Sequence, residues 1–179
     1  MVDLSDIFYL FARFGDRSYG EDVTQLAHAL EAAHFAHEAG ESDAMVAAAL
    51  LHDVGQLLDE AGSVGEREAR DARHELTGAD YLARWFPEPV LAPIRLHVAA
   101  KRYLCWREPD YLGSLSAASA LSLRLQGGAF SDEEAAAFIR LPFAEEGLRL
   151  WRYDDRGKVN DLAVPALDFF HPMLSAMAR

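Results

Sequence analysis

The sequence has little of several features that mark other classes of protein. Its 179 residues include one cysteine, Cys105, which cannot form an intrachain disulfide, so no oxidising compartment is required. The main apolar run, which includes residues 45–51, is much too short to cross a bilayer. The first residues lack the basic and then apolar segments of a signal peptide. We therefore expect a cytoplasmic protein without a membrane segment.

Positive charge is also scarce. The chain has 17 basic and 29 acidic residues, a formal net charge of −12, whereas a duplex-binding module usually presents a basic face. Nucleic-acid binding is therefore disfavoured. A small anionic substrate stays open, because metals and a few basic side chains can make a site locally positive. The only lysines are Lys101 and Lys158.

The chain also lacks the sustained period-two alternation of β-strands, while Ala, Leu, Glu and Arg, which favour helices, dominate. Hydrophobic residues make up 51% and charged residues 26%, as in a folded protein with a core. We expect one all-α domain over residues 1–179, with Pro93 beginning the main body of its helix and a loop at 62–68. Helices are predicted near residues 5–14, 22–39, 43–59, 71–86, 88–104 and 114–126, and further helices after Ser131, Pro142 and Pro165.

The main chemical signal is the pair His52–Asp53, at the end of the apolar segment Ala47–Leu51. An ionised Asp beneath apolar residues needs a cation or several donors, and both residue types are good ligands for first-row metals. A pair alone is more simply a capping Asp beside a core His. Further candidate ligands lie on successive helical segments: His28, His74, His97 and Asp154. Six nitrogen and oxygen ligands exceed a closed tetrahedral site and suit two metal ions that share a carboxylate.

This ordered set resembles the HD-domain superfamily of metal enzymes, over about residues 20–155. His74 and His97 are the mark of its dinuclear branch. Within that branch the chain resembles the organophosphonate-degrading oxygenases, in residues 17–21, 23–28 and 52–55, in Lys101 and in Asp154. Those enzymes use a mixed-valent Fe(II)/Fe(III) pair and O₂ on 1-hydroxy-2-aminoethylphosphonate or its trimethylammonio analogue. They cleave the C–P bond and release phosphate with glycine or glycine betaine.

The resemblance implies a role for each of the six candidate ligands. One iron would be bound by His28, His52, Asp53 and Asp154. Asp53 would bridge to a second iron, held by His74 and His97.

The resemblance also implies three residues around the irons. Tyr19 would cover an open iron position until substrate enters, Glu21 would face the cationic nitrogen, and Lys101 would hold the phosphonate. Glu21 lies two helical turns before His28, and Lys101 lies one turn after His97, so each shares a face with a ligand. The ordinary alternatives are a solvated helix N-terminus for Tyr19 and Glu21 and a surface lysine for Lys101.

Other candidates for substrate binding have open alternatives. Ser119 and Ser122 lie in a helix of small residues and would donate hydroxyls to phosphonate oxygens or serve close helix packing. Gln56 stands where the aminohydroxyethylphosphonate enzymes carry a histidine that grips the phosphonate. A glutamine donates a hydrogen bond but carries no charge, which favours a relative such as the trimethylammonio type.

Two arginines, Arg152 and Arg156, flank Asp154 and are either anion ligands or ion-pair partners of Asp155. The remaining histidines are expected to be structural: His34, His37 and His171.

Two other functions compete with the oxygenase. A metal-dependent phosphohydrolase would use metal-activated water on a nucleotide or other phosphate ester. Tyr19, Glu21 and Lys101 argue against it. A non-catalytic helical module is opposed by the complete set of six ligands. We expect a monomer or small homo-oligomer acting on a small organophosphonate.

Overall fold

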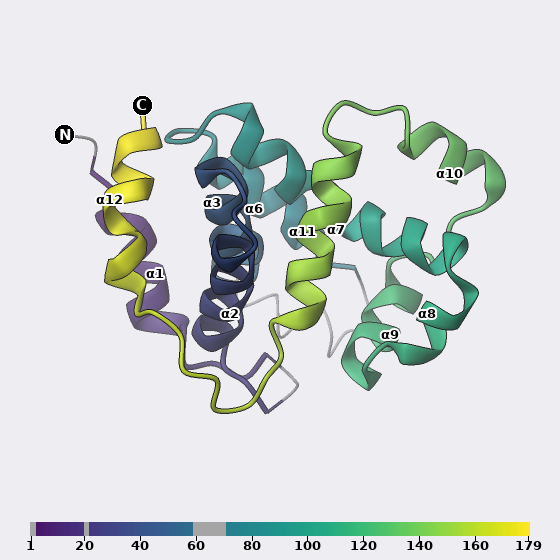
Figure 1. Cartoon of the computed structure of the whole chain (residues 1–179), viewed down its shortest axis with the longest axis horizontal. Coiled ribbons are helices and arrows are strands. Elements are labelled where there is room, and N and C mark those ends of the chain that lie inside the picture. The colour runs from purple at the N-terminus through teal and green to yellow at the C-terminus, as the bar shows by residue number, and fades with distance from the viewer. Residues whose placement is uncertain (1–2, 20–21, 59–70) are drawn as a thin grey trace.

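The computed structural model describes residues 3–19, 22–58 and 71–179, and within these ranges the protein is an all-α helical bundle, as predicted (Figure 1). No strand forms there, and the one β contact is an isolated bridge between Ser18 and Thr24. The helices are α1 (Ser5–Phe14), α2 (Gln25–Glu38), α3 (Asp43–Leu51), α4 (Val54–Leu58), α6 (His74–Leu82), α7 (Glu88–Arg107), α8 (Pro109–Ser114), α9 (Ala117–Leu125), α10 (Asp132–Phe138), α11 (Ala144–Arg156) and α12 (Leu167–Met177).

Short hydroxyl side chains begin several of these helices. Thr24 precedes α2 and accepts a hydrogen bond from the backbone N–H of Ala27, which would otherwise lack a partner. Ser131 forms a capping box with Glu134, so the helix start predicted there is confirmed.

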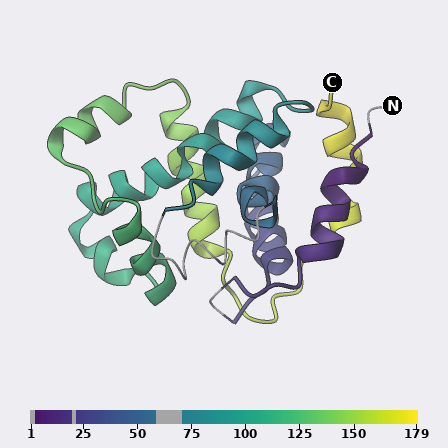
Figure 2. The ribbon, with the colours of Figure 1, turned by 180° about the vertical axis from the view of Figure 1, so that it is seen from behind.

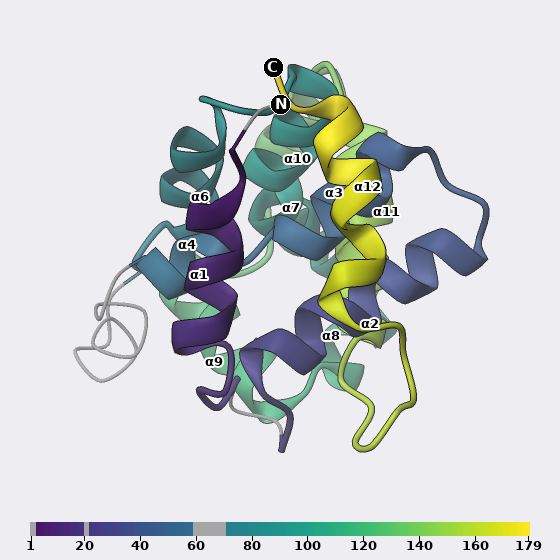
Figure 3. The ribbon, with the colours of Figure 1, turned by 90° about the vertical axis from the view of Figure 1, so that its left-hand side faces the viewer.

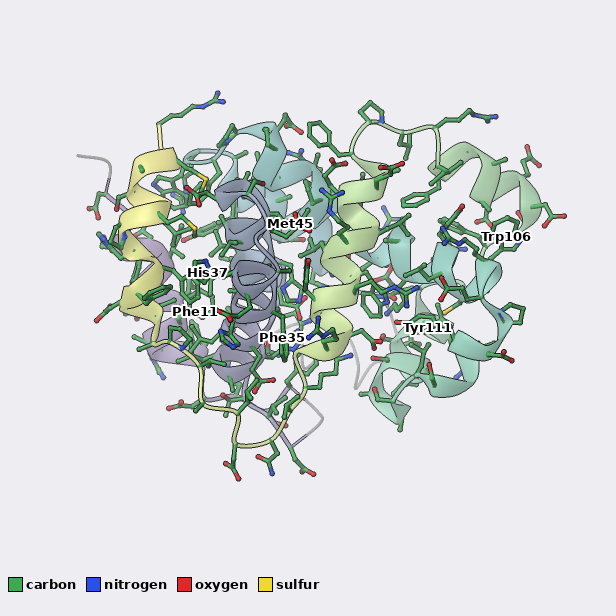
Figure 4. All side chains as sticks on the ribbon, viewed as in Figure 1. Phe11, Phe35, His37, Met45, Trp106 and Tyr111 are labelled. Carbon is green, nitrogen blue, oxygen red and sulfur yellow. The ribbon has the colours of Figure 1, made fainter. Side chains whose placement is uncertain are left out.

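The apolar segment on α3 forms the centre of the main core. Every residue from Met45 to Leu51 is buried, and Met45, labelled in Figure 4, is 2% exposed. Neighbouring helices α2, α7, α11 and α12 pack against α3. This burial explains why the run has no polar face. It also brings His52, at the end of α3, into the interior.

A smaller core lies beside the main one, where α10 packs on α7 (Figure 1). It contains Tyr103 and Leu104 of α7, Phe138 of α10 and Trp151 of α11. Trp151 donates a hydrogen bond from its indole N–H to the hydroxyl of Tyr111 at 2.6 Å, which joins α11 to α8. Tyr111 is labelled in Figure 4. These contacts fix the positions of α7 and α11, which carry the candidate ligands His97 and Asp154.

The two ends of the described chain meet at the edge opposite α8–α10 (Figure 2). There α1 and α12 lie side by side (Figure 3), and the rings of Phe8 and His171 are 5.0 Å apart. Among the described residues, none of the helices has the length and apolar character that a membrane span requires.

Some predicted helix boundaries were wrong. The helix predicted over 43–59 is interrupted at His52–Asp53, which gives α3 and α4. The helix predicted over 114–126 begins only at Ala117, because Leu115 has extended backbone and Ser116 caps α9. Residues 22–24 and 71–73 are also outside the helices predicted there. The loop predicted at 62–68 lies outside the described residues.

Pro93 does not begin the main body of its helix. The helix α7 begins at Glu88, and Pro89 occupies its first turn, where a missing N–H needs no partner. Pro93 lies inside α7, four residues later. The lost hydrogen bond is then the one to the carbonyl of Pro89, in the first turn of the helix.

Candidate metal centre

The six predicted ligands come from five places in the chain and converge in one buried region. His28 lies on α2, His97 on α7 and Asp154 on α11, while His74 is the first residue of α6. The other two are consecutive, and successive residues of a continuous helix point about 100° apart. The interruption between α3 and α4 therefore allows both His52 and Asp53 to reach the same centre.

Two glycines explain how α6 comes close enough to contribute His74. A Cβ on Gly55 would overlap the carbonyl oxygen of His74. A Cβ on Gly78 would lie 2.8 Å from the backbone nitrogen of Gly55. Because neither residue carries a side chain, the backbones of α4 and α6 touch at this point. This contact brings His74 to Asp53.

The first group of ligand atoms joins His28, His52 and Asp154. The Nε2 atoms of the two histidines are 3.1 Å apart. Oδ1 of Asp154 lies 3.5 Å from Nε2 of His28, and Oδ2 lies 3.7 Å from Nε2 of His52. All three side chains are buried, and one ligand atom from each lies within 4.8 Å of the others.

The second group joins Asp53, His74 and His97. Nε2 of His74 lies 3.0 Å from Oδ1 of Asp53 and 3.2 Å from Nε2 of His97. The other carboxylate oxygen, Oδ2 of Asp53, faces the first group, at 3.7 Å from His28 and 3.5 Å from His52. Asp53 therefore lies between two groups and presents one oxygen to each, as a bridging carboxylate does.

The hydrogen-bonding pattern of the histidines fits a pair of cations. Nδ1 of His28, His52 and His97 lies 2.6–2.8 Å from a backbone carbonyl oxygen. Because a carbonyl oxygen only accepts, Nδ1 carries the hydrogen and Nε2 keeps a lone pair. His28 and His52 therefore direct two lone pairs at each other at 3.1 Å. A cation between them resolves this repulsion, and a metal at this place also supplies a partner to Oδ2 of Asp53, which no donor among the described residues satisfies.

Burial keeps two of these imidazoles neutral. It lowers the pKa of His28 to about 4 and that of His97 to about 3, and nearby Asp residues only partly offset this effect. Both rings are therefore unprotonated at neutral pH, and no proton competes with a metal for Nε2.

A cavity of about 80 Å³ opens onto the centre. Its wall includes Asp53 and His97 of the centre, so a small molecule in the cavity reaches the ligand groups directly. Three of the residues predicted to act on substrate also line it: Tyr19, Gln56 and Lys101. Ser119 and Ser122 complete its α9 side.

Tyr19 lies directly over the first group. Its ring stacks on His28 with centroids 3.8 Å apart and planes 19° apart, and its hydroxyl donates to Oδ1 of Asp154 at 3.4 Å. The role predicted for Tyr19, covering an open iron position, stays a prediction. Glu21, which was predicted to act beside it, lies outside the described residues.

Lys101 is buried rather than on the surface, with only 3% of the residue exposed. Its ammonium donates to Oγ of Ser122 at 2.7 Å and lies 5.0 Å from the centre of the Trp151 ring. Burial lowers the pKa of Lys101 to about 8, although Asp154 counteracts this effect. The side chain therefore remains mostly charged at pH 7 and provides a cation in the cavity wall.

Lys158 is the residue of this region that the sequence analysis missed. It donates to Oγ of Ser119 at 2.9 Å, and its ammonium lies 3.9 Å from Oδ1 of Asp154. It follows Asp154 by four residues, the spacing of a shared helical face, and this signal was available in the sequence.

The segment around Lys158 is fastened to α2 on both sides. The carbonyl of Gly157 contacts Nδ1 of His28 at 2.6 Å. The backbone N–H of Val159 donates to Glu31 at 2.8 Å.

Arg152 and Arg156, which were expected to be anion ligands or ion-pair partners of Asp155, are not among the lining residues of the cavity as described. Arg152 donates to both carboxylate oxygens of Glu108 at 2.7 Å, and the guanidinium of Arg156 lies over the ring of Phe35. Each is two residues from Asp154, and residues two apart on a helix point to different faces. The three histidines expected to be structural contact aromatic rings outside the two ligand groups: His34, His37 and His171.

Comparison with known proteins places the same residues in a family. A family model described as HD domain matches residues 26–126, which hold five of the six candidate ligands. A hydroxymethylphosphonate dioxygenase of Gimesia maris is 44% identical over 169 residues, 94% of this chain and 84% of that protein. The glycine-betaine-forming [1-hydroxy-2-(trimethylamino)ethyl]phosphonate dioxygenase of Leisingera caerulea is 39% identical, over 94% of this chain and 86% of that protein. An uncharacterized protein of Acanthamoeba polyphaga mimivirus is 35% identical over 96% of this chain and 80% of its own.

Proposed function

Because this chain belongs to the HD-domain family and has phosphonate dioxygenases among its relatives, we propose that it is an oxygenase that cleaves the C–P bond of a small 1-hydroxyphosphonate. The observation that carries the proposal is the pair of ligand groups that share Asp53 beside a cavity with a buried lysine. A non-catalytic module would not need a buried cation facing two ligand groups.

The cofactor we propose is a mixed-valent Fe(II)/Fe(III) pair. His28, His52, Asp53 and Asp154 would hold one ion, and His74 and His97 would hold the other, with Asp53 shared between them. When bound, the irons would supply the redox chemistry that the reaction with O₂ needs. The mixed nitrogen and carboxylate donors suit first-row metals of this kind.

The phosphonate is bound at the α9 side of the cavity. Lys101 provides one positive charge in the wall of the cavity. Lys158 is not among the lining residues as described, and it adds positive charge behind Ser119, to which it donates. Lys158 donates to Oγ of Ser119, so the hydrogen of that hydroxyl is available to a phosphonate oxygen. Ser122 differs, because its hydroxyl donates to the carbonyl of Ser119 at 3.1 Å. Ser122 therefore positions Lys101 and does not itself donate to the anion.

Tyr19 controls access to the first ligand group. Its ring covers His28 and its hydroxyl holds Asp154, so both contacts must loosen before a further ligand reaches that group. We propose that substrate entry displaces Tyr19, and that Glu21 meets the cationic nitrogen of substrates that have one.

The balanced reaction uses one O₂. A dianion R–CH(OH)–PO₃²⁻ and O₂ give R–COO⁻, HPO₄²⁻ and H⁺, so the carbinol carbon is oxidised by four electrons while O₂ is reduced. The C–P bond and the C–H bond of the carbinol carbon break, a new C–O bond and a P–O bond form, and the two hydrogens of the carbinol group end on phosphate and as H⁺. A hydrolase has no such route, because a C–P bond has no ester oxygen to leave.

Two substrate classes follow from the relatives and the site. The first is 1-hydroxy-2-(amino or trimethylammonio)ethylphosphonate, which gives glycine or glycine betaine. The second is hydroxymethylphosphonate, favoured by the relative from Gimesia maris.

The test is an oxygen-dependence experiment on protein loaded anaerobically with iron. Each of these phosphonates is added with and without O₂, and phosphate release and O₂ uptake are measured together. We expect one O₂ consumed per phosphate, and no phosphate under argon. Phosphate released from an ordinary phosphate ester under argon, at the rate of the aerobic reaction, would instead indicate a phosphohydrolase.

A further inference from the structure

A hydrogen bond between two glutamines lies behind the wall of the cavity. Gln25 is the first residue of α2 and is buried, with 8% of the residue exposed. Its side-chain Nε2 donates to Oε1 of Gln56 on α4 at 3.0 Å. Gln56 lines the cavity and Gln25 does not. The contact therefore joins a substrate-facing residue to one that cannot touch the substrate.

This hydrogen bond decides which end of the Gln56 amide faces the cavity. An amide has an acceptor, the carbonyl oxygen, and a donor, the NH₂ group, on opposite sides. Since Gln25 uses the acceptor, the donor remains for the cavity. A phosphonate dianion has only acceptor oxygens, so the NH₂ group attracts it and the carbonyl oxygen would repel it.

The position of Gln25 is fixed by the start of α2. Thr24 caps the helix, and the backbone N–H of Gln25 donates to the carbonyl of Arg17 at 2.9 Å. Gln25 also precedes His28 by three residues, so both lie on the face of α2 that looks toward the centre. The helix that holds a metal ligand thereby also holds the partner of Gln56.

We infer that Gln25 is a positioning residue for phosphonate binding: it holds the Gln56 amide with its NH₂ group toward the anion. The inference rests on the proposed function and deepens it, because it adds a neutral donor from α4 to the charged donor of α7, Lys101. It also explains how Gln56, which is uncharged, contributes to anion binding in the cavity.

The decisive variant is Gln25→Glu, which keeps the size of the side chain but only accepts hydrogen bonds near neutral pH. Gln56 then makes this contact only by rotating its amide, which turns its carbonyl toward the anion. We expect KM for the hydroxyphosphonate to rise about tenfold, the lower end of the contribution of a hydrogen bond to a charged group. The value of kcat changes less than about twofold, because the reacting carbon is not touched. Gln25→Leu removes the donor without adding charge and raises KM less.

A double-mutant cycle separates orientation from charge and from folding. In a Gln56→Leu background there is no amide to orient, so adding Gln25→Glu changes KM by less than about twofold. Dissociation constants for methylphosphonate, an unreactive anion without a hydroxyl, are measured by calorimetry on the same iron-loaded proteins. They follow the same pattern without any turnover, and iron content equal to the parent's shows that the centre is intact.

Unchanged KM and methylphosphonate affinity in Gln25→Glu would overturn the inference. So would a tenfold effect of this substitution that persists in the Gln56→Leu background, since it would then come from the added charge alone. Failure of the proposed function has a different outcome: the parent releases no phosphate from any hydroxyphosphonate, while the methylphosphonate measurements still decide the role of Gln25.

Discussion

Replacing Lys101 with methionine removes the charge of the cavity wall while keeping an unbranched side chain of similar length. The ammonium is buried, donates to Ser122 at 2.7 Å and is the one charged donor in the lining of the cavity as described. A hydrogen bond between charged partners contributes about 1.5–3 kcal/mol. The expected result is a rise in KM of about 10- to 150-fold, with the iron content unchanged because no ligand is altered.

The pH dependence of KM in the parent protein provides a second test of the role of Lys101. Burial lowers the pKa of Lys101 to about 8, so the side chain is charged below that pH and loses its proton above it. If only the charged form binds the phosphonate, KM rises roughly tenfold between pH 7 and pH 9. Ionisation of the phosphonate itself works in the opposite direction, because the anion gains charge as the pH rises. The charged groups that act on Lys101 are Asp154, Lys158 and Asp53.

Lys101→Met should therefore have a high KM that no longer rises above pH 8. Phosphate release is followed from pH 6.5 to 9.5 at saturating O₂. The control is Arg95→Met, which removes a cation from the same helix that pairs with Glu88 at 3.0 Å outside the cavity, and it should behave as the parent. A Lys101→Met protein with parental KM, or one that retains the rise above pH 8, would refute the assignment.

Three other predictions concern the metals, the backbone contact and the source of oxygen. Anaerobically loaded protein should hold about two iron ions by elemental analysis and His74→Ala about one, whereas a parent limited to one ion would contradict the two-group centre. Gly55→Ala should lower the free energy of unfolding by on the order of 2–4 kcal/mol in urea, because its Cβ overlaps the carbonyl of His74, while Gly113→Ala, which meets no atom within 4 Å, should have little effect. With ¹⁸O₂, mass spectrometry should find one labelled atom in the carboxylate product, and unlabelled carboxylate would argue against oxygen insertion.

The all-α fold and the six candidate ligands could be predicted because local signals carry them. Helix formers and capping residues set the elements, and the His–Asp pair indicates a metal because further candidate ligands lie on successive helical segments. The interruption of the helix at His52–Asp53 was not predicted, because no glycine or proline stands between Leu51 and Val54. The structure explains the interruption, because it allows two consecutive residues, His52 and Asp53, to face the same centre.

The residues around the metals were harder to predict, because their positions depend on packing between distant helices. Closeness in sequence to Asp154 suggested Arg152 and Arg156, although a spacing of two residues turns both away. Lys158, at a spacing of four, was overlooked. The role of Gln25 depends on the approach of α4 to α2, which the sequence does not reveal.

The attachment of residues 157–159 to α2 couples the candidate metal centre to the anion-binding side of the cavity. Nδ1 of His28 contacts the carbonyl oxygen of Gly157, and Glu31 accepts a hydrogen bond from the N–H of Val159. Lys158 therefore lies between two contacts with α2, the helix that also supplies the candidate ligand His28. A metal ion whose preferred bond lengths move His28 therefore also moves Lys158, whose ammonium donates to Ser119. Exchange of one metal for another should thus change anion affinity through thermodynamic linkage, and by reciprocity a bound anion should change the preference among metals.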